Sequence, residues 1–165
     1  MSGKLLFELL RQASVASDDL TRLATDFVRD RLAIGTRGWT CHPLGFFVSK
    51  LSIGDGMELR LHVWPSDWAL PTEQMDADLH DHIFALSSLV LSGVISNETF
   101  EMVIDDSGGF RTIDVAYSGN TSGGSSLGST LFRLDQRTTA IHRPGEIYHV
   151  AAGVVHRGGA VRLLR

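Results

Sequence analysis

The stretch LHDHIFALSSLVLSG, residues 79–93, places two histidines one residue apart at the head of an apolar run. Side chains alternate between the two faces of a β-strand, so an extended segment here directs His80, His82, Phe84 and Leu86 to one face. Two imidazoles about 7 Å apart along one strand face can converge on a single metal ion. Neutral imidazole is the commonest protein ligand for zinc, iron, copper and nickel. The stretch therefore predicts a strand that carries part of a metal site.

Two helices are expected ahead of this strand. Apolar residues recur at helical spacing in two segments between residues 1 and 37. Ser17 and the two aspartates after it suit the N-cap and first turn of the second helix. Gly35 is placed to end that helix.

The remainder of the chain has the pattern of an all-β body. After Gly38, short runs rich in Val, Ile, Phe, Leu and Thr alternate with turn signals such as GDG at 54–56. The Gly/Ser-rich stretch 117–129 is expected to be a mobile loop, a long hairpin connection. We predict a single domain over residues 1–165, with a helical segment, 1–37, followed by an all-β body, 38–165.

Composition limits the function classes. The chain has 165 residues, 43% of them hydrophobic, which suits one well-filled core and one domain. A formal net charge of -4 offers no electrostatic footprint for nucleic acid. No apolar run reaches the roughly 18 residues of a membrane span and no secretory signal pattern is present, so the expected location is the cytoplasm. One cysteine, Cys41, excludes an internal disulfide framework and a multi-cysteine zinc site.

A second stretch, PGEIYHVAAGVVHRGG at 144–159, contains a glycine turn that directs His156 back toward the sheet. Together the two stretches resemble the two motifs of the cupin superfamily, which carry the spaced histidines of that family. Gly93 matches the closing glycine of the first motif, and Gly145, Gly153 and His156 match the second. The resemblance spans roughly residues 46–164 and implies a cupin-type double-stranded β-helix barrel.

Several positions depart from the cupin pattern. Leu86 stands where the first motif has its glutamate ligand, so the resemblance implies three neutral imidazoles, His80, His82 and His156, beside an apolar wall. The other departures are Gln74 for Gly, Ala151 for Pro and Ala160 for Asn.

Three-histidine sites are typical of the cysteine dioxygenase group of cupins, which this chain resembles before and within its first motif. That likeness implies Fe(II) and a small anionic substrate, such as a thiol or an amino-acid derivative, that reacts with O2. Zn, Ni and Mn are the alternative metals. The group commonly has a Ser-His-Tyr relay beyond the third ligand. Only nine residues follow His156 and none is Ser, His or Tyr, so the metal site carries over but the thiol-recognition apparatus does not.

Further residues are candidates for substrate binding. Arg60, His62 and Trp64 share one face of ELRLHVW; if it looks into the barrel, Arg60 could hold a substrate carboxylate and Trp64 could line the cavity. The alternative is that the Leu and Val residues between them form the core side and Arg60 is solvated. Tyr148 and His149 alternate, so only one can face the pocket, and His149 is either a fourth ligand or a packed or hydrogen-bonded core histidine. Leu86 would form the apolar wall.

Three functions remain open. The first is a mononuclear iron oxygenase, favoured because no obvious acid/base carboxylate is expected to face the histidines: Asp81, between His80 and His82, is expected on the opposite face of the strand. The second is a non-redox isomerase, lyase or decarboxylase in which Zn, Mn or Ni acts as a Lewis acid. The third is a binding cupin without turnover. By analogy with cupins, a homodimer is plausible.

Overall fold

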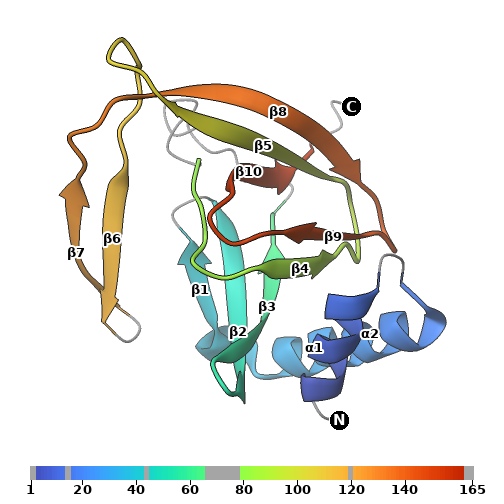
Figure 1. Cartoon of the computed structure of the whole chain (residues 1–165). Helices are drawn as coiled ribbons and strands as arrows, with labels where there is room; N and C mark the ends of the chain where they lie inside the picture. Colours follow the sequence, from blue (N-terminus) through green and yellow to red (C-terminus); the bar gives the residue numbers. More distant parts are fainter. Residues whose placement is uncertain (1–2, 14–15, 43–44, 66–78, 119–120, 162–165) are drawn as a thin grey trace.

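The computed structural model describes residues 3–13, 16–42, 45–65, 79–118 and 121–161. Two helices precede a body built from antiparallel strands, so the predicted helical segment and mainly β body are confirmed (Figure 1). Among the described residues, no helix is long and apolar enough to cross a membrane. The elements are α1 Gly3–Gln12, α2 Asp18–Ala33, a short 3₁₀ helix Gly35–Gly38, β1 Trp39–His42, β2 Phe46–Gly54, β3 Met57–Val63, β4 Leu86–Leu89, β5 Ile95–Ile104, β6 Ile113–Ser118, β7 Thr121–Leu127, β8 Phe132–His142, β9 Ile147–Val150 and β10 Val155–Ala160.

Local signals explain where the second helix begins and ends. The Ser17 side chain accepts a hydrogen bond from the backbone N–H of Leu20 at 3.2 Å, which satisfies one of the free donors of the first turn. Gly35 follows the C-cap with a φ of 62°, a left-handed conformation that glycine adopts without a steric penalty. Both predicted boundaries are therefore confirmed.

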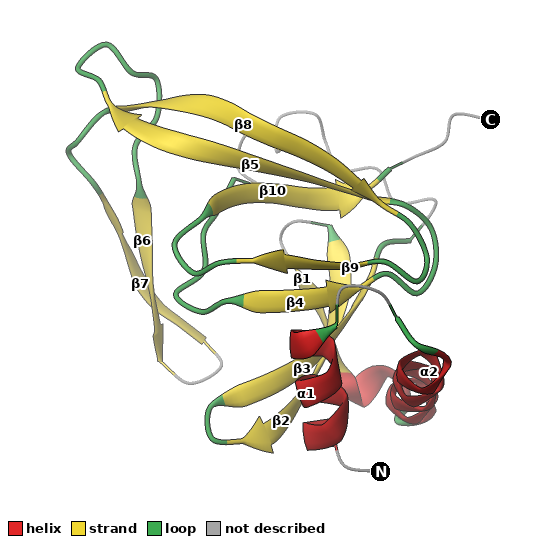
Figure 2. Ribbon diagram, turned by 45° about the vertical axis from the view of Figure 1, so that its right-hand side comes forward, coloured by secondary structure: helices red, strands yellow, loops and turns green. Residues whose placement is uncertain are grey.

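The strands form four antiparallel groups. Two are three-stranded, in the orders β1-β2-β3 and β10-β5-β8, and two are pairs, β4-β9 and β6-β7. The β4-β9 pair lies between the two three-stranded sheets, whereas the β6-β7 hairpin stands apart from them (Figures 1 and 2). The predicted GDG turn joins β2 to β3, with positive φ at all three of its residues.

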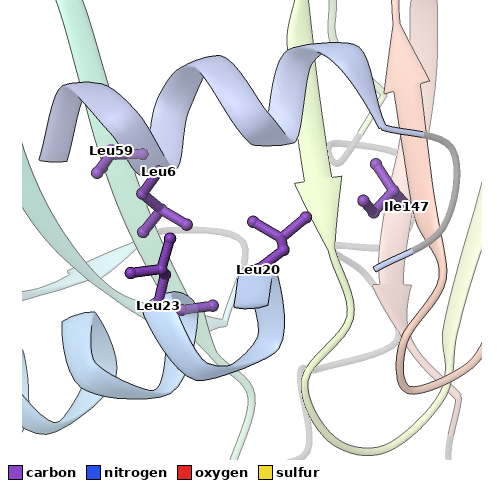
Figure 3. Packing of buried hydrophobic residues seen from close by; sticks show 6 residues of the cluster. Leu6, Leu20, Leu23, Leu59 and Ile147 are labelled. Atoms are coloured by element: carbon purple, nitrogen blue, oxygen red, sulfur yellow. The ribbon is translucent and has the colours of Figure 1, made fainter. Parts of the chain in front are cut away.

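One hydrophobic cluster fastens the helices to the strands. Leu6 and Leu20 are 2% and 1% exposed and come from the two helices, while Leu59 and Ile147 come from β3 and β9 (Figure 3). The cluster therefore covers one face of β3 and β9. Because strand residues alternate, Arg60, His62 and Trp64 lie on the face of the β3 segment that the helices do not cover.

Two sequence expectations about extended structure are wrong. Residues 79–93 do not form one strand: His80 makes an isolated bridge, 81–85 lie outside the ladders, and the strand is limited to Leu86–Leu89. The Gly/Ser-rich stretch is also not simply a loop, because 121–127 pair with β6 from Thr121 to Leu127. Cross-strand hydrogen bonding there overrides the weak strand preference of glycine and serine. The cupin position Gln74 lies outside the described residues.

Candidate metal centre

Three histidines that are far apart in the sequence meet at one point. His80 and His156 exchange both backbone hydrogen bonds, with N–O distances of 3.0 and 2.8 Å, which places them directly opposite each other. His82 follows two residues later, and its carbonyl accepts a hydrogen bond of 2.8 Å from the Gly153 N–H. The positive φ of Gly153, 74°, lets the turn before β10 approach in this way.

The three imidazoles face a common volume. Their ring centroids lie 4.6 Å apart for His80 and His156, 4.8 Å for His80 and His82, and 5.2 Å for His82 and His156. One ligand nitrogen from each ring lies within 4.8 Å of the other two. Since metal–imidazole bonds are about 2.1 Å long, small side-chain rotations would close this set on one ion.

His156 is the most buried of the three. Its residue is 6% exposed, and its Nδ1 lies 3.0 Å from Oδ1 of Asn97, which is itself 6% exposed. Its other nitrogen, Nε2, is buried and has no hydrogen-bond partner among the described residues. Buried polar atoms are almost always paired, so an unpartnered imidazole nitrogen within a histidine cluster fits a metal ligand.

The environment keeps two of these histidines neutral. Burial first, and then the neighbouring His80, lower the pKa of His82 to about 4. Burial, followed by His80 and His82, lowers the pKa of His156 to about 4 as well. Neutral imidazole is the form that binds metal. Both side chains are therefore ready to bind an ion at neutral pH without first losing a proton.

We expect the metal-free protein to lose stability as the pH falls from about 6.5 to about 4. His62, like His82 and His156, has its pKa lowered to about 4, by burial and then by the charge of Arg60. In that window the unfolded chain binds more protons than the folded one, so the free energy of unfolding rises with pH and is highest above about 6.5. Urea denaturation at pH 7.5 and 5.0 checks this; equal midpoints would contradict it.

The opposite wall of the site is aromatic and carries one cation. On the face of β3 away from the helices, the rings of His62 and Trp64 lie 4.7 and 5.1 Å from that of Phe46. The Arg60 guanidinium lies 5.2 Å from the centre of the Phe84 ring, and Phe84 stacks on His82 at 5.1 Å. The Arg60 charge contributes to the lowered pKa of His82. This face thus looks toward the histidines, while Arg60 and His62 on it are themselves exposed to solvent.

Arg60 already forms an ion pair with Glu58. Its Nε donates to a Glu58 carboxylate oxygen at 2.5 Å, and about a third of its side chain is exposed. Guanidinium groups have five N–H donors, so this bond leaves donors for a further anion.

Leu86 on β4 and Tyr148 on β9 are two of the candidate substrate-binding residues. Leu86 pairs with Val150 and, by alternation from the helix-packed Leu89, points away from the helices. Tyr148 stacks on His142 at 4.4 Å, and burial raises the pKa of its hydroxyl. Tyr148 alternates with the helix-packed Ile147, so the side chains of both Leu86 and Tyr148 lie on the face of the β4-β9 pair that points away from the helices.

His149 lies on the other face of β9. Its two ring nitrogens contact Ser87 Oγ at 2.8 Å and the Ala13 carbonyl at 3.2 Å, so it ties β9 to the chain after α1. It also lines a hollow of about 600 Å³ with Glu101 and Arg137, and none of the three clustered histidines lines that hollow. These bonds make His149 a hydrogen-bonded histidine at an exposed position, and it does not belong to the histidine cluster of the described residues.

Asn97 is the residue that the sequence analysis missed. The signal available was a single asparagine, a residue that is usually exposed, within the strand-like run VISNETF. Its role emerges only from the register of β5 against β10, which places Asn97 two residues along the strand from the partner of His156.

Comparison with family models, curated proteins and solved structures finds no match to this chain.

Proposed function

We propose that this protein is a mononuclear, metal-dependent oxygenase that acts on a small anionic substrate, with His80, His82 and His156 as the protein ligands. The observation that carries the proposal is the convergence of three imidazoles on a point where the buried His156 Nε2 has no partner among the described residues. The ligand group contains no carboxylate. A set of neutral ligands leaves the charge of the ion uncompensated, which favours an anionic substrate.

The arrangement of strands supports a cupin-type barrel around this centre. The three histidines come from the segment before β4 and from β10, and the sheet β1-β2-β3 supplies the facing aromatic wall. A site flanked by two sheets is the placement that the cupin resemblance implies. We therefore propose the double-stranded β-helix as the fold class.

Fe(II) would supply open coordination positions and a one-electron redox couple for oxidation by O2. Side chains of the protein would orient the substrate and limit access of water. Arg60 places a cation beside Phe84 and His82, where it can orient a substrate carboxylate or other anion. Leu86 and the ring of Phe84 would limit water near the substrate.

Metal content and oxygen uptake test the proposal together. Protein purified without chelator is analysed for metal, then reconstituted without oxygen with Fe(II), Zn(II), Ni(II) or Mn(II) and mixed with small thiols, amino acids and carboxylates. Of the four metals, we expect only Fe(II) to support O2 uptake, and only when a substrate is present. Turnover without O2 uptake would instead identify the non-redox enzyme, and bound ligand without turnover would identify a binding protein; either result would overturn the oxygenase.

Leu86→Glu should convert the centre into one with a fourth, anionic ligand. We expect the ion to raise the melting temperature of this variant more than that of the wild type, and O2 uptake to fall at least about tenfold as fewer positions stay open to substrate. Without a nearby ion, a partly buried Glu would cost several kcal/mol or take up a proton. Thermal melting with and without metal measures this.

Leu86→Gln is the matched control, because glutamine has the same length without the charge. If metal stabilises the Glu and Gln variants equally, Leu86 does not face the ion.

A further inference from the structure

Asn97 is one of three buried polar or charged residues among those described, with Ser49 and His156. It contacts His156 through a 3.0 Å hydrogen bond between the amide oxygen and Nδ1. A carbonyl oxygen only accepts, so Nδ1 must carry the proton and Nε2 must hold a lone pair. The opposite tautomer would leave a buried N–H on Nε2 without a partner among the described residues, which is unfavourable because that donor has lost its hydrogen bonds to water.

The strand register places Asn97 next to His156 and places few other polar side chains near the two residues. Its direct cross-strand neighbours are Gly158 on β10 and Ala140 on β8, and neither has a polar side chain. Thr99, which lies directly opposite His156, bonds instead to the Thr138 hydroxyl at 2.7 Å. The amide of Asn97 is therefore the group that contacts the third histidine from within this sheet.

We propose that Asn97 is a positioning residue that fixes His156 in the tautomer with its Nε2 lone pair directed at the ion. This inference rests on the proposed metal function. An amide, unlike a carboxylate, adds no negative charge behind the ligand, so it orients the ring and leaves the centre with the full charge of the ion. The same bond prevents rotation of the ring away from His80 and His82.

The tautomer is read directly, without metal, by long-range ¹H–¹⁵N NMR of the ¹⁵N-labelled full-length protein at pH 7.5. We expect His156 to show a protonated Nδ1 and an unprotonated Nε2. In Asn97→Leu, which has similar volume and no acceptor, we expect a mixture of tautomers. A wild-type His156 with its proton on Nε2 would overturn the proposal.

Metal affinity provides the second readout, measured by Co(II) absorbance with Zn(II) competition. We expect Asn97→Leu to weaken binding about 10- to 100-fold, the usual effect of losing a hydrogen-bond partner of a ligand. Asn97→Asp keeps an acceptor and should hold affinity within about threefold of the wild type or increase it. The matched control is Thr99→Val, on the same strand face, which should leave affinity unchanged.

The outcomes separate this inference from the proposed function. If the wild type binds no Co(II), the proposed metal centre is contradicted. If the wild type and Asn97→Leu bind with equal affinity, only the proposed role of Asn97 is contradicted. If Asn97→Leu does not fold, Asn97→Asp decides: a loss of affinity beyond tenfold in that folded variant contradicts a role that depends on the acceptor.

Discussion

Replacing His156 with alanine is expected to abolish stoichiometric metal binding. The side chain is one of three in the cluster, and its removal leaves two imidazoles, which are too few protein ligands to hold the ion against water. Loss of an outer hydrogen-bond partner alone costs up to about 100-fold in affinity, and loss of the ligand itself should cost more. The Co(II) titration used for Asn97 measures the change.

His149→Ala is the matched control for this result. Its two ring nitrogens contact Ser87 and the Ala13 carbonyl, so its removal should leave the metal affinity unchanged. If His156→Ala kept one ion per chain while His149→Ala lost it, the ligand set would have to be reassigned to include His149.

Leu20→Ala is expected to lower the free energy of unfolding by about 2.7–5 kcal/mol, the range for buried leucines in well-packed cores. Leu20 is 1% exposed and belongs to the cluster that joins both helices to β3 and β9. Deleting its side chain would leave a cavity between the helices and the strands. Urea denaturation followed by circular dichroism measures the loss.

Leu32→Ala, also in α2, is the control because Leu32 is 58% exposed. We expect it to change stability by no more than about 0.5 kcal/mol. Similar losses in the two variants would mean that the helices do not pack on the β body as described.

The features that the sequence predicted depend on nearby residues. The Ser17 N-cap, Gly35 and the GDG turn are each determined by a few consecutive side chains, and the structure confirms all three. The switch from helices to strands near Gly38 is similarly visible in the period of the apolar residues.

Features that depend on strand pairing could not be predicted in the same way. The Gly/Ser-rich segment becomes β7 only because β6 pairs with it. Residues 81–85 leave the ladder even though their composition favours a strand, and Ile83 is 97% exposed as a result.

In the candidate site, too, residues in a local motif could be predicted from the sequence, whereas contacts that depend on strand pairing could not. His80, His82 and His156 stood out because their spacing matched a known pattern, and the structure does bring them together. Asn97 carried no motif, since its contact with His156 arises from the alignment of β5 with β10. Arg60, His62 and Trp64 were identified as one face, but only the packing of Leu59 against the helices indicates which way that face points.

X-ray absorption at the metal edge of the reconstituted protein tests the central claim most directly, because scattering from imidazole rings counts the histidine ligands of the bound ion. We predict one ion per chain with three imidazoles and further oxygen ligands. A first shell with fewer than three imidazoles, or no stoichiometric ion at all, would contradict a centre built from His80, His82 and His156.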